Sequence, residues 1–122
     1  MTNVINWFEI PASDFGRAVK FYGEILGKEL MTMEAGGGPY AMFQTDGEGV
    51  GGAIAQGEFY TPSDKGVTIY FSCGEDLSPV LGRVEAAGGQ VVMPKTLIDE
   101  ENGYFAFFMD TEGNRVGLHS RH

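Results

Sequence analysis

The strongest constraint on the fold of this chain is an internal repeat of one order of structural elements. Residues 13–27 (SDFGRAVKFYGEILG) and 76–89 (DLSPVLGRVEAAGG) both place apolar side chains at helical spacing. Each run ends in glycine, and Gly27 and Gly88 lie 61 residues apart. Glycine readily takes the left-handed backbone conformation that often follows a helix. We therefore expect two helices at equivalent places of a duplicated unit.

Strand-like runs surround both expected helices in the same order. Residues 4–10 and 67–73, which are rich in β-branched and aromatic side chains, precede them. Three extended runs follow each helix, at 28–33, 40–44 and 50–55 in the first half and at 90–93, 104–109 and 115–119 in the second. Each half thus reads strand–helix–strand–strand–strand, which predicts an α+β fold of two βαβββ modules.

The length of 122 residues fits a single domain. Within it we expect module one at residues 1–59 and module two at residues 67–122. The segment between them, 60–66 (YTPSDKG), holds the Pro, Ser and Asp residues typical of a turn. This segment is the expected linker.

Composition narrows the choice of partner and compartment. The formal net charge of −9 argues against nucleic acid, whose phosphates would be repelled, and is compatible with a cationic or neutral ligand. The single cysteine, Cys73, cannot form a disulfide within the chain, so we expect a reducing, cytoplasmic location. No apolar run is long enough for a membrane span, and residues 1–11 lack the basic and apolar regions of a leader peptide.

Three motifs in sequence order carry a resemblance to a known superfamily. They are FEIPASDFGRAVKFYGEILG at 8–27, RVEAAGGQVVMPKT at 83–96 and FMDTEGNRVGL at 108–118. Together with the repeat, they resemble the vicinal oxygen chelate superfamily of glyoxalases, bleomycin resistance proteins and dioxygenases, in its lactoylglutathione-lyase-related branch. The resemblance implies tandem βαβββ modules that form an open, cup-shaped mixed sheet. It also implies a ligand site in the cup and a homodimer.

The resemblance further implies a divalent metal on the floor of the cup, held by residues of the first and last strand of each module. Carried over one position at a time, these residues are Trp7 and Thr68 on the first strands, and Ala53 and Gly117 on the last strands. An indole N–H only donates, a lone threonine hydroxyl is a poor ligand, and alanine and glycine offer no ligand atom. We therefore expect no metal cofactor, although the superfamily usually has one.

Strand alternation adds three residues to the same faces as these positions: Glu9, Tyr70 and His119. Glu9 could act as a catalytic base in a dry cup, or it could be a solvated strand residue. Tyr70, like Trp7, could contact a flat ligand or pack in the core. His119 could contact a ligand or lie in a frayed terminal strand. Residues 35–39, which are rich in glycine, are expected to form a mobile loop at the mouth of the cup.

Three functions remain open at this point. The leading hypothesis is a protein that binds a small organic molecule in a cup without the usual metal ligands, with Trp7, Ala53, Thr68, Tyr70, Gly117 and His119 lining it. The second is an enzyme, either a metal-dependent glyoxalase-like lyase or dioxygenase, or a metal-free variant that uses Glu9 as a base. The third is a non-catalytic, dimeric interaction domain.

Overall fold

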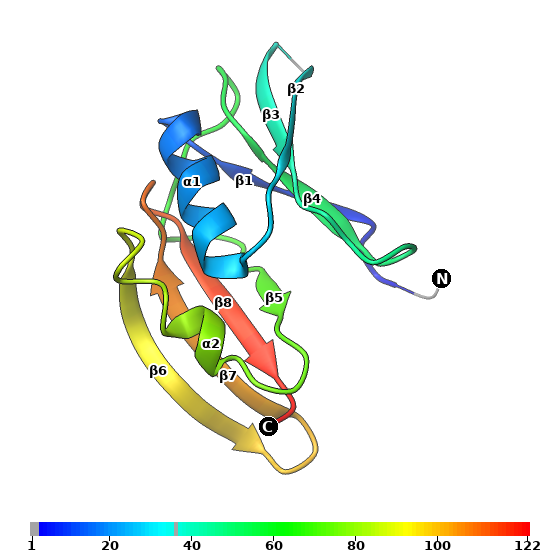
Figure 1. The fold of residues 1–122 in the computed structure, drawn as a ribbon, viewed down its shortest axis with the longest axis vertical. Helices are drawn as coiled ribbons and strands as arrows, with labels where there is room; N and C mark the ends of the chain where they lie inside the picture. Colours follow the sequence, from blue (N-terminus) through cyan, green and yellow to red (C-terminus); the bar gives the residue numbers. More distant parts are fainter. Residues whose placement is uncertain (1–2, 36) are drawn as a thin grey trace.

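The computed structural model describes residues 3–35 and 37–122, which contain two four-stranded mixed sheets (Figure 1). In spatial order, the N-sheet consists of β1 (Trp7–Pro11), β4 (Gly51–Ala55), β3 (Gly38–Met42) and β2 (Met31–Ala35). In the equivalent order, the C-sheet consists of β5 (Tyr70–Ser72), β8 (Arg115–Ser120), β7 (Gly103–Met109) and β6 (Gln90–Asp99). In both sheets the first pair of strands is parallel and the other pairs are antiparallel. The expected α+β fold with two βαβββ units is confirmed.

Helix α1 spans Phe15–Leu26, is capped by Asp14 at its start and ends at the glycine that the sequence predicts. The Asp14 carboxylate accepts a hydrogen bond from the backbone N–H of Arg17 at 3.2 Å. Gly27 ends the helix in the left-handed conformation, with φ of 70°. In the described part of the chain, no helix is long and apolar enough to cross a membrane.

Helix α2 is much shorter than its apolar pattern predicts. It spans only Ser78–Leu81, whereas the pattern covers residues 76–89. Several hydrogen bonds after it span three residues instead of four, as in a series of turns. Gly82 weakens the helix at this point, because glycine loses more backbone freedom than other residues when it is held in a helix. Val84 is nevertheless fully buried, so the pattern identified the buried face and not the extent of the helix.

Two strands of the C-sheet also differ from the expected lengths. Strand β5 begins only at Tyr70, so Thr68 precedes the strand instead of lying in it. Strand β6 continues to Asp99, well past the expected end at residue 93. Irregular register between β6 and β7 lets this long edge strand bend along its neighbour, which the local sequence pattern does not reveal.

Ala35, Gly38 and Pro39 of the glycine-rich run lie in paired strands, contrary to the expected loop. Strands β2 and β3 pair in antiparallel fashion, with Ala35 opposite Gly38. Gly37 has φ of 88°, a conformation that glycine adopts without steric cost and that suits a tight turn. Gly36 lies outside the described residues.

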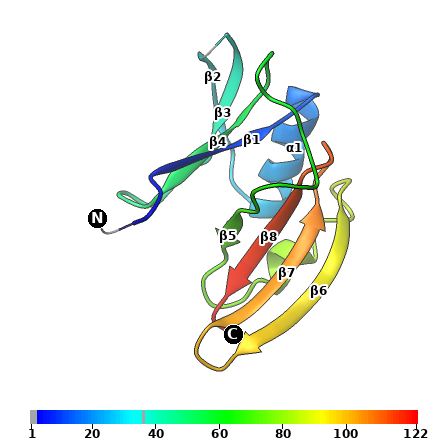
Figure 2. The same cartoon turned by 180° about the vertical axis from the view of Figure 1, so that it is seen from behind.

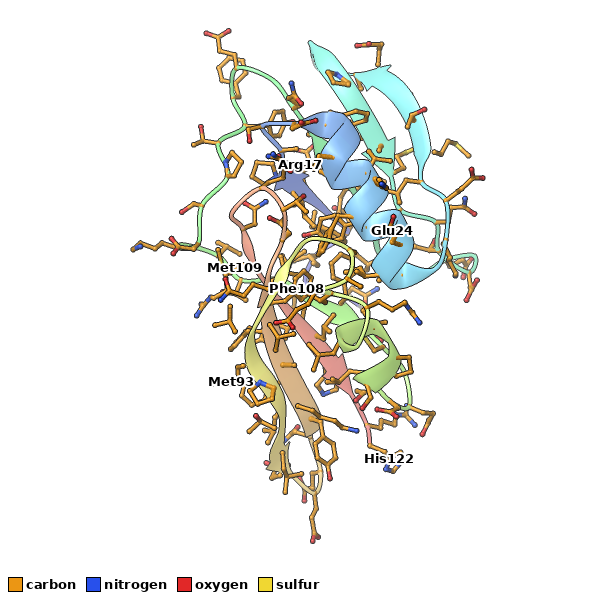
Figure 3. All side chains as sticks on the ribbon, turned by 60° about the vertical axis from the view of Figure 1, so that its left-hand side comes forward. Arg17, Glu24, Met93, Phe108, Met109 and His122 are labelled. Atoms are coloured by element: carbon orange, nitrogen blue, oxygen red, sulfur yellow. The ribbon has the colours of Figure 1, made fainter. Side chains whose placement is uncertain are left out.

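One core joins the two sheets, which lie toward opposite ends of the long axis of the molecule (Figures 1 and 2). It contains the side chains of Ile10 and Ile54 from the N-sheet, and of Phe108 from the C-sheet. Phe108 packs against α1, with its ring centroid 5.8 Å from that of Phe21 (Figure 3). Both sheets therefore turn their helix-covered faces to this core, and their opposite faces point away from it.

A buried polar network also ties the second half of the chain to the start of α1. The Glu112 carboxylate accepts hydrogen bonds from the backbone N–H of Asp14 at 2.7 Å and from Arg17 Nε at 2.7 Å. Burial alone would raise the pKa of Glu112, but hydrogen bonds from Arg17, Asp14, Thr111 and Ser13 outweigh burial and lower this pKa to about 2. Arg17 is labelled on α1 in Figure 3.

Candidate functional site

The N-face, as we call the side of the N-sheet opposite the core, carries two of the sequence-predicted site residues on one strand. Trp7 and Glu9 alternate along β1 with Phe8 and Ile10, which face the core. Register places Glu9 beside Ala53 of β4, so these three candidates share one face. The Trp7 side chain is 42% exposed, whereas Ala53 is fully buried beneath its neighbours.

A chain of hydrogen bonds converges on the Glu9 carboxylate. Trp7 Nε1 donates to the Tyr40 hydroxyl at 2.8 Å, and Tyr40 in turn donates to Glu9 Oε2 at 2.7 Å. The Tyr60 hydroxyl donates to the other carboxylate oxygen, Oε1, at 2.8 Å. The hydrogen bond to Glu9 raises the pKa of Tyr60, while burial, followed by the same kind of hydrogen bond, raises the pKa of Tyr40. Both phenols therefore remain neutral donors at physiological pH.

Sequence reasoning did not find Tyr40 or Tyr60 as members of this cluster. Tyr40 could have been found, because it lies in a predicted strand whose alternate residues share a face. Tyr60 lies in the expected linker, where the sequence carries no periodic signal that relates it to Glu9. Only the path of the chain after β4 brings this phenol to the N-face.

The C-face, as we call the side of the C-sheet opposite the core, carries Tyr70, Gly117 and His119. Register pairs Tyr70 of β5 with Gly117 of β8. A methyl group at Gly117 would overlap the Tyr70 ring, so this ring lies directly on the glycine. The Tyr70 ring centroid is also 5.7 Å from that of Phe107. An aromatic surface therefore covers Gly117.

The polar candidates of the C-face are already held by neighbouring groups. His119 Nε2 lies 2.6 Å from the backbone oxygen of Asn102. Because a carbonyl only accepts, this nitrogen must carry the ring proton and donate it. Thr68 accepts a hydrogen bond from Arg115 at 3.1 Å, and the Arg115 guanidinium lies 4.8 Å from the Phe107 ring centroid. Arg115 is a C-face residue that sequence reasoning did not single out.

The predicted site residues thus fall into two groups that one chain does not bring together. Trp7, Glu9 and Ala53 belong to the N-face, whereas Tyr70, Gly117, His119 and the adjacent Thr68 belong to the C-face. The shared core lies between the helix-covered sides of the two sheets. Within one chain, the two open faces therefore point apart and do not form the two walls of a single cup.

The donor set at the four family metal positions does not fit a divalent cation. Trp7 uses its only polar atom to donate to Tyr40, and Ala53 and Gly117 have none. The Thr68 hydroxyl accepts from the positively charged Arg115. Within residues 3–35 and 37–122, no three His, Cys, Asp or Glu side chains come together.

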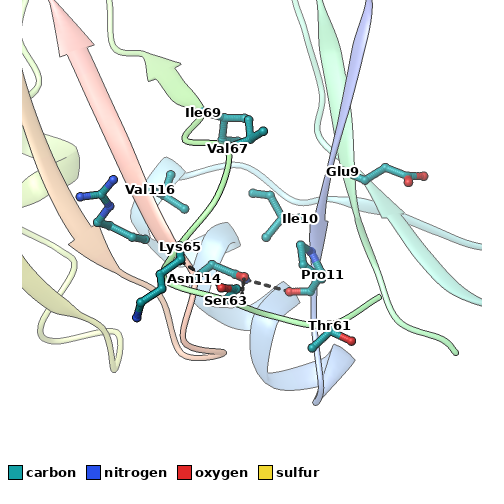
Figure 4. Close-up of a pocket in the computed structure, with 11 residues that line it drawn as sticks. Glu9, Ile10, Pro11, Thr61, Ser63, Lys65, Val67, Ile69, Asn114 and Val116 are labelled. Atoms are coloured by element: carbon teal, nitrogen blue, oxygen red, sulfur yellow. Dashed lines mark hydrogen bonds between the residues drawn. The ribbon is translucent and has the colours of Figure 1, made fainter. Parts of the chain in front are cut away.

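A groove of about 240 Å³ lies where the two sheets diverge (Figure 4). Ile10, Ile69 and Val116 give it apolar walls, and Lys65 and Asn114 add polar groups. The Asn114 side chain donates to the backbone oxygen of Pro11 at 2.8 Å, and both residues line the groove. Glu9 also lines the groove, and its carboxylate points away from Lys65 and Asn114 (Figure 4).

Comparison with known proteins decides the family. A family model described as the Glyoxalase/Bleomycin resistance protein/Dioxygenase superfamily matches residues 4–118, which is nearly the whole chain. The chain belongs to this superfamily. The match agrees with the duplicated topology described above, and with the resemblance that the three sequence motifs carry.

Individual members of the superfamily share the fold at low identity. The chain is 29% identical over 115 residues to CFP32 of Mycobacterium bovis, named as a candidate glyoxylase; the match covers 93% of this chain and 44% of that protein. A glyoxalase/bleomycin resistance protein from Albidiferax ferrireducens T118 superposes with a TM-score of 0.77 at 17% identity, and covers 98% of this chain and 100% of the other. TnmS3, an antibiotic binding protein from Streptomyces sp. CB03234, superposes with a TM-score of 0.66 at 22% identity over 97% and 95% of the two chains. The chain thus spans less than half the length of the curated relative.

Proposed function

We propose that this chain is a small-molecule binding protein that works as a homodimer and holds a flat organic ligand without a divalent metal. One observation carries the proposal: exposed aromatic side chains occupy both open faces, at and next to the positions where the superfamily holds its metal. Trp7 is 42% exposed on the N-face, and Tyr70 is 51% exposed on the C-face. Concave sites lined by aromatic groups with a few polar atoms suit small organic molecules.

A second copy of the chain is the proposed partner of the open faces, because one chain leaves both of them uncovered. Met31 and Met33 on the N-face are 58% and 47% exposed, and apolar surface of this kind marks an interaction site. Glu9 on the N-face and Arg115 on the C-face carry opposite charges, which favours contact between these faces of two copies. Docking the N-face of one copy on the C-face of the other builds one cup from two chains.

A protein that only binds its ligand, without catalysing a reaction, can still have a function. A tight binder lowers the free concentration of its ligand by mass action. The fold neighbour TnmS3, which is described as an antibiotic binding protein, is an example of binding within the same fold. For Glu9, two phenol donors already occupy part of its accepting capacity, which favours a binding role over that of a free catalytic base.

The dimer is tested by sedimentation equilibrium of the wild-type chain and of two charged variants. We expect Met33→Glu to weaken self-association at least tenfold, because it places a carboxylate in the apolar contact. Val4→Glu is the matched control, since Val4 is 90% exposed and precedes β1. A wild-type chain that stays monomeric at every concentration would refute the two-chain cup.

Ligand binding is tested by thermal-shift screening of flat organic molecules against protein purified without a metal-binding tag. We expect at least one compound to raise the melting temperature equally with and without a chelator. Trp7→Ala should abolish this shift, whereas Phe59→Ala, which removes an aromatic ring that is 87% exposed outside both faces, should keep it. One stoichiometric divalent ion per chain in elemental analysis would contradict the metal-free site.

A further inference from the structure

The hydrogen bonds around Glu9 have a direction that the chemistry of the groups fixes. An indole nitrogen only donates, so the Tyr40 oxygen must accept from Trp7. Tyr40 has one hydroxyl proton, and a carboxylate only accepts, so this proton points to Glu9. The same argument directs the Tyr60 proton to the other carboxylate oxygen. All three side-chain donors of the cluster are therefore committed inside it.

What the cluster offers to a ligand is consequently a set of acceptors. Each Glu9 oxygen accepts one phenol hydrogen bond and keeps further lone-pair capacity, and the Tyr60 oxygen keeps its own. A ligand carbonyl or carboxylate would find no free side-chain donor here, and a ligand anion would be repelled by Glu9. A ligand that brings N–H donors and positive charge matches what remains.

The carboxylate also lacks a cation from its own chain. None of the ion pairs in the described part of the chain includes Glu9. The two cationic side chains of the neighbouring groove have other contacts. Lys65 pairs with Asp64 at 3.1 Å, and Arg115 is held by Thr68 and the Phe107 ring. Within one chain, the negative charge of Glu9 is thus left to solvent or to a ligand.

Aromatic rings around the carboxylate favour the same kind of ligand group. Tyr40 and Tyr60 donate to the carboxylate and Trp7 donates to Tyr40, so one hydrogen-bonded cluster holds three aromatic rings together with Glu9. The Trp7 ring lies over Gly51, because a methyl group at Gly51 would come within 3.3 Å of it. A cation near aromatic rings gains electrostatic stabilisation from them, and the net charge of −9 raises the local concentration of cations.

We propose that Glu9, with Trp7, Tyr40 and Tyr60, is the recognition site for an ammonium group, so that the ligand of this protein is an aromatic or other organic amine. The proposal rests on the small-molecule function proposed above and adds its chemical class. Glu9 and the Tyr60 oxygen accept the ammonium N–H groups, and the rings flank the positive charge.

A matched pair of probes tests the proposal: 2-phenylethylammonium and 2-phenylethanol, which present the same ring and differ in the terminal group. Trp7 is the only tryptophan, so its fluorescence reports binding at this site. We expect the wild-type dimer to bind the ammonium probe about tenfold more tightly than the alcohol. Glu9→Gln should bring the two affinities to within about twofold, because it removes the charge and keeps the shape.

Glu58→Gln is the control for long-range electrostatics, since it changes the net charge equally at an exposed residue that makes no hydrogen bond to the cluster. It should keep the tenfold preference. Equal affinities in the wild type, or equal losses in Glu58→Gln and Glu9→Gln, would overturn the ammonium site and leave the small-molecule function standing. A preference that appears only in Arg115→Gln would also overturn it, by identifying the Arg115 of a second copy as the cation. If neither probe nor any screened compound binds, both proposals fail.

Discussion

Glu9 and Glu112 are both carboxylates that accept several hydrogen bonds, yet their surroundings differ in kind. The Glu112 side chain has no exposed surface, and it bonds to backbone N–H groups at the start of α1 and to Arg17. Glu9 is exposed, bonds only to two neutral phenols and has no cationic partner in the described residues. Glu112 thus has a counter-charge and several donors, whereas Glu9 has two donors, no counter-charge and remaining capacity to accept.

This difference separates a structural role from a binding role. A carboxylate with its counter-charge already bound has nothing to offer a ligand and contributes to the folded state. An exposed carboxylate without a counter-charge contributes little to stability, because solvent screens it, but it can still attract a cation. Substitutions at the two sites should therefore move different measured quantities.

The largest effect on stability is expected from Glu112→Gln. It removes the charge that Arg17 and the N–H groups of Ser13 and Asp14 share, and breaking a buried pair costs roughly 3–5 kcal/mol. Because the Arg17 side chain is 51% exposed, we expect a loss near the lower end, about 3 kcal/mol in urea unfolding. Glu24→Gln, at an exposed position of α1, should change stability by less than about 0.5 kcal/mol. Equal urea midpoints for the two variants would contradict the comparison.

Glu112 should also account for most of the stability that the protein loses at acidic pH. Glu112 has a pKa of about 2 in the folded protein, against an ordinary value of 4.5. A depressed folded-state pKa gives stability that is present above the ordinary value and is lost as pH falls through the folded one. We expect the wild type to lose on the order of 3 kcal/mol between about pH 4.5 and pH 2 through this group. Glu112→Gln should lack this part of the pH dependence, and a wild-type curve that is parallel to that of the variant would refute the assignment.

A smaller loss of stability is expected from removing one hydroxyl group of the buried polar network that contains Glu112. The fully buried Tyr22 hydroxyl donates to Asp110 at 2.7 Å. Tyr22→Phe should cost about 1–2 kcal/mol, because it leaves a buried carboxylate oxygen with one donor fewer. Asp110 still accepts from Asn114, so the network should weaken without collapse. Calorimetry that shows no change in melting temperature would indicate that the network contributes nothing measurable.

The smallest effect on stability is expected from the same chemical change in the exposed cluster. Tyr60→Phe removes a phenol donor from Glu9 and should change the free energy of unfolding by less than about 0.5 kcal/mol, because water replaces the donor. Glu9→Gln should be equally mild. A loss as large as that of Tyr22→Phe would mean that the Glu9 cluster is structural, and would break the distinction between the two carboxylates.

The sequence alone determined the architecture, because its signals are local. Helical spacing, Asp14 and Gly27 specify α1, and the duplicated order of strands specifies two equivalent sheets. The absence of competent metal ligands at Trp7 and Gly117 likewise follows from residue identity. The apolar spacing overestimated the length of the second helix, because the helix ends before Gly82 and turns follow it.

Tertiary structure alone decided which residues meet. Periodicity tells which side of a strand Glu9 occupies, but the approach of Tyr60 depends on the path of the chain across 51 residues. The direction of the two open faces depends on one shared core, in which the Phe8 and Phe71 rings from different sheets lie 5.8 Å apart. Such contacts arise from packing between distant segments, and a local pattern carries no information about the angle or register at which those segments dock.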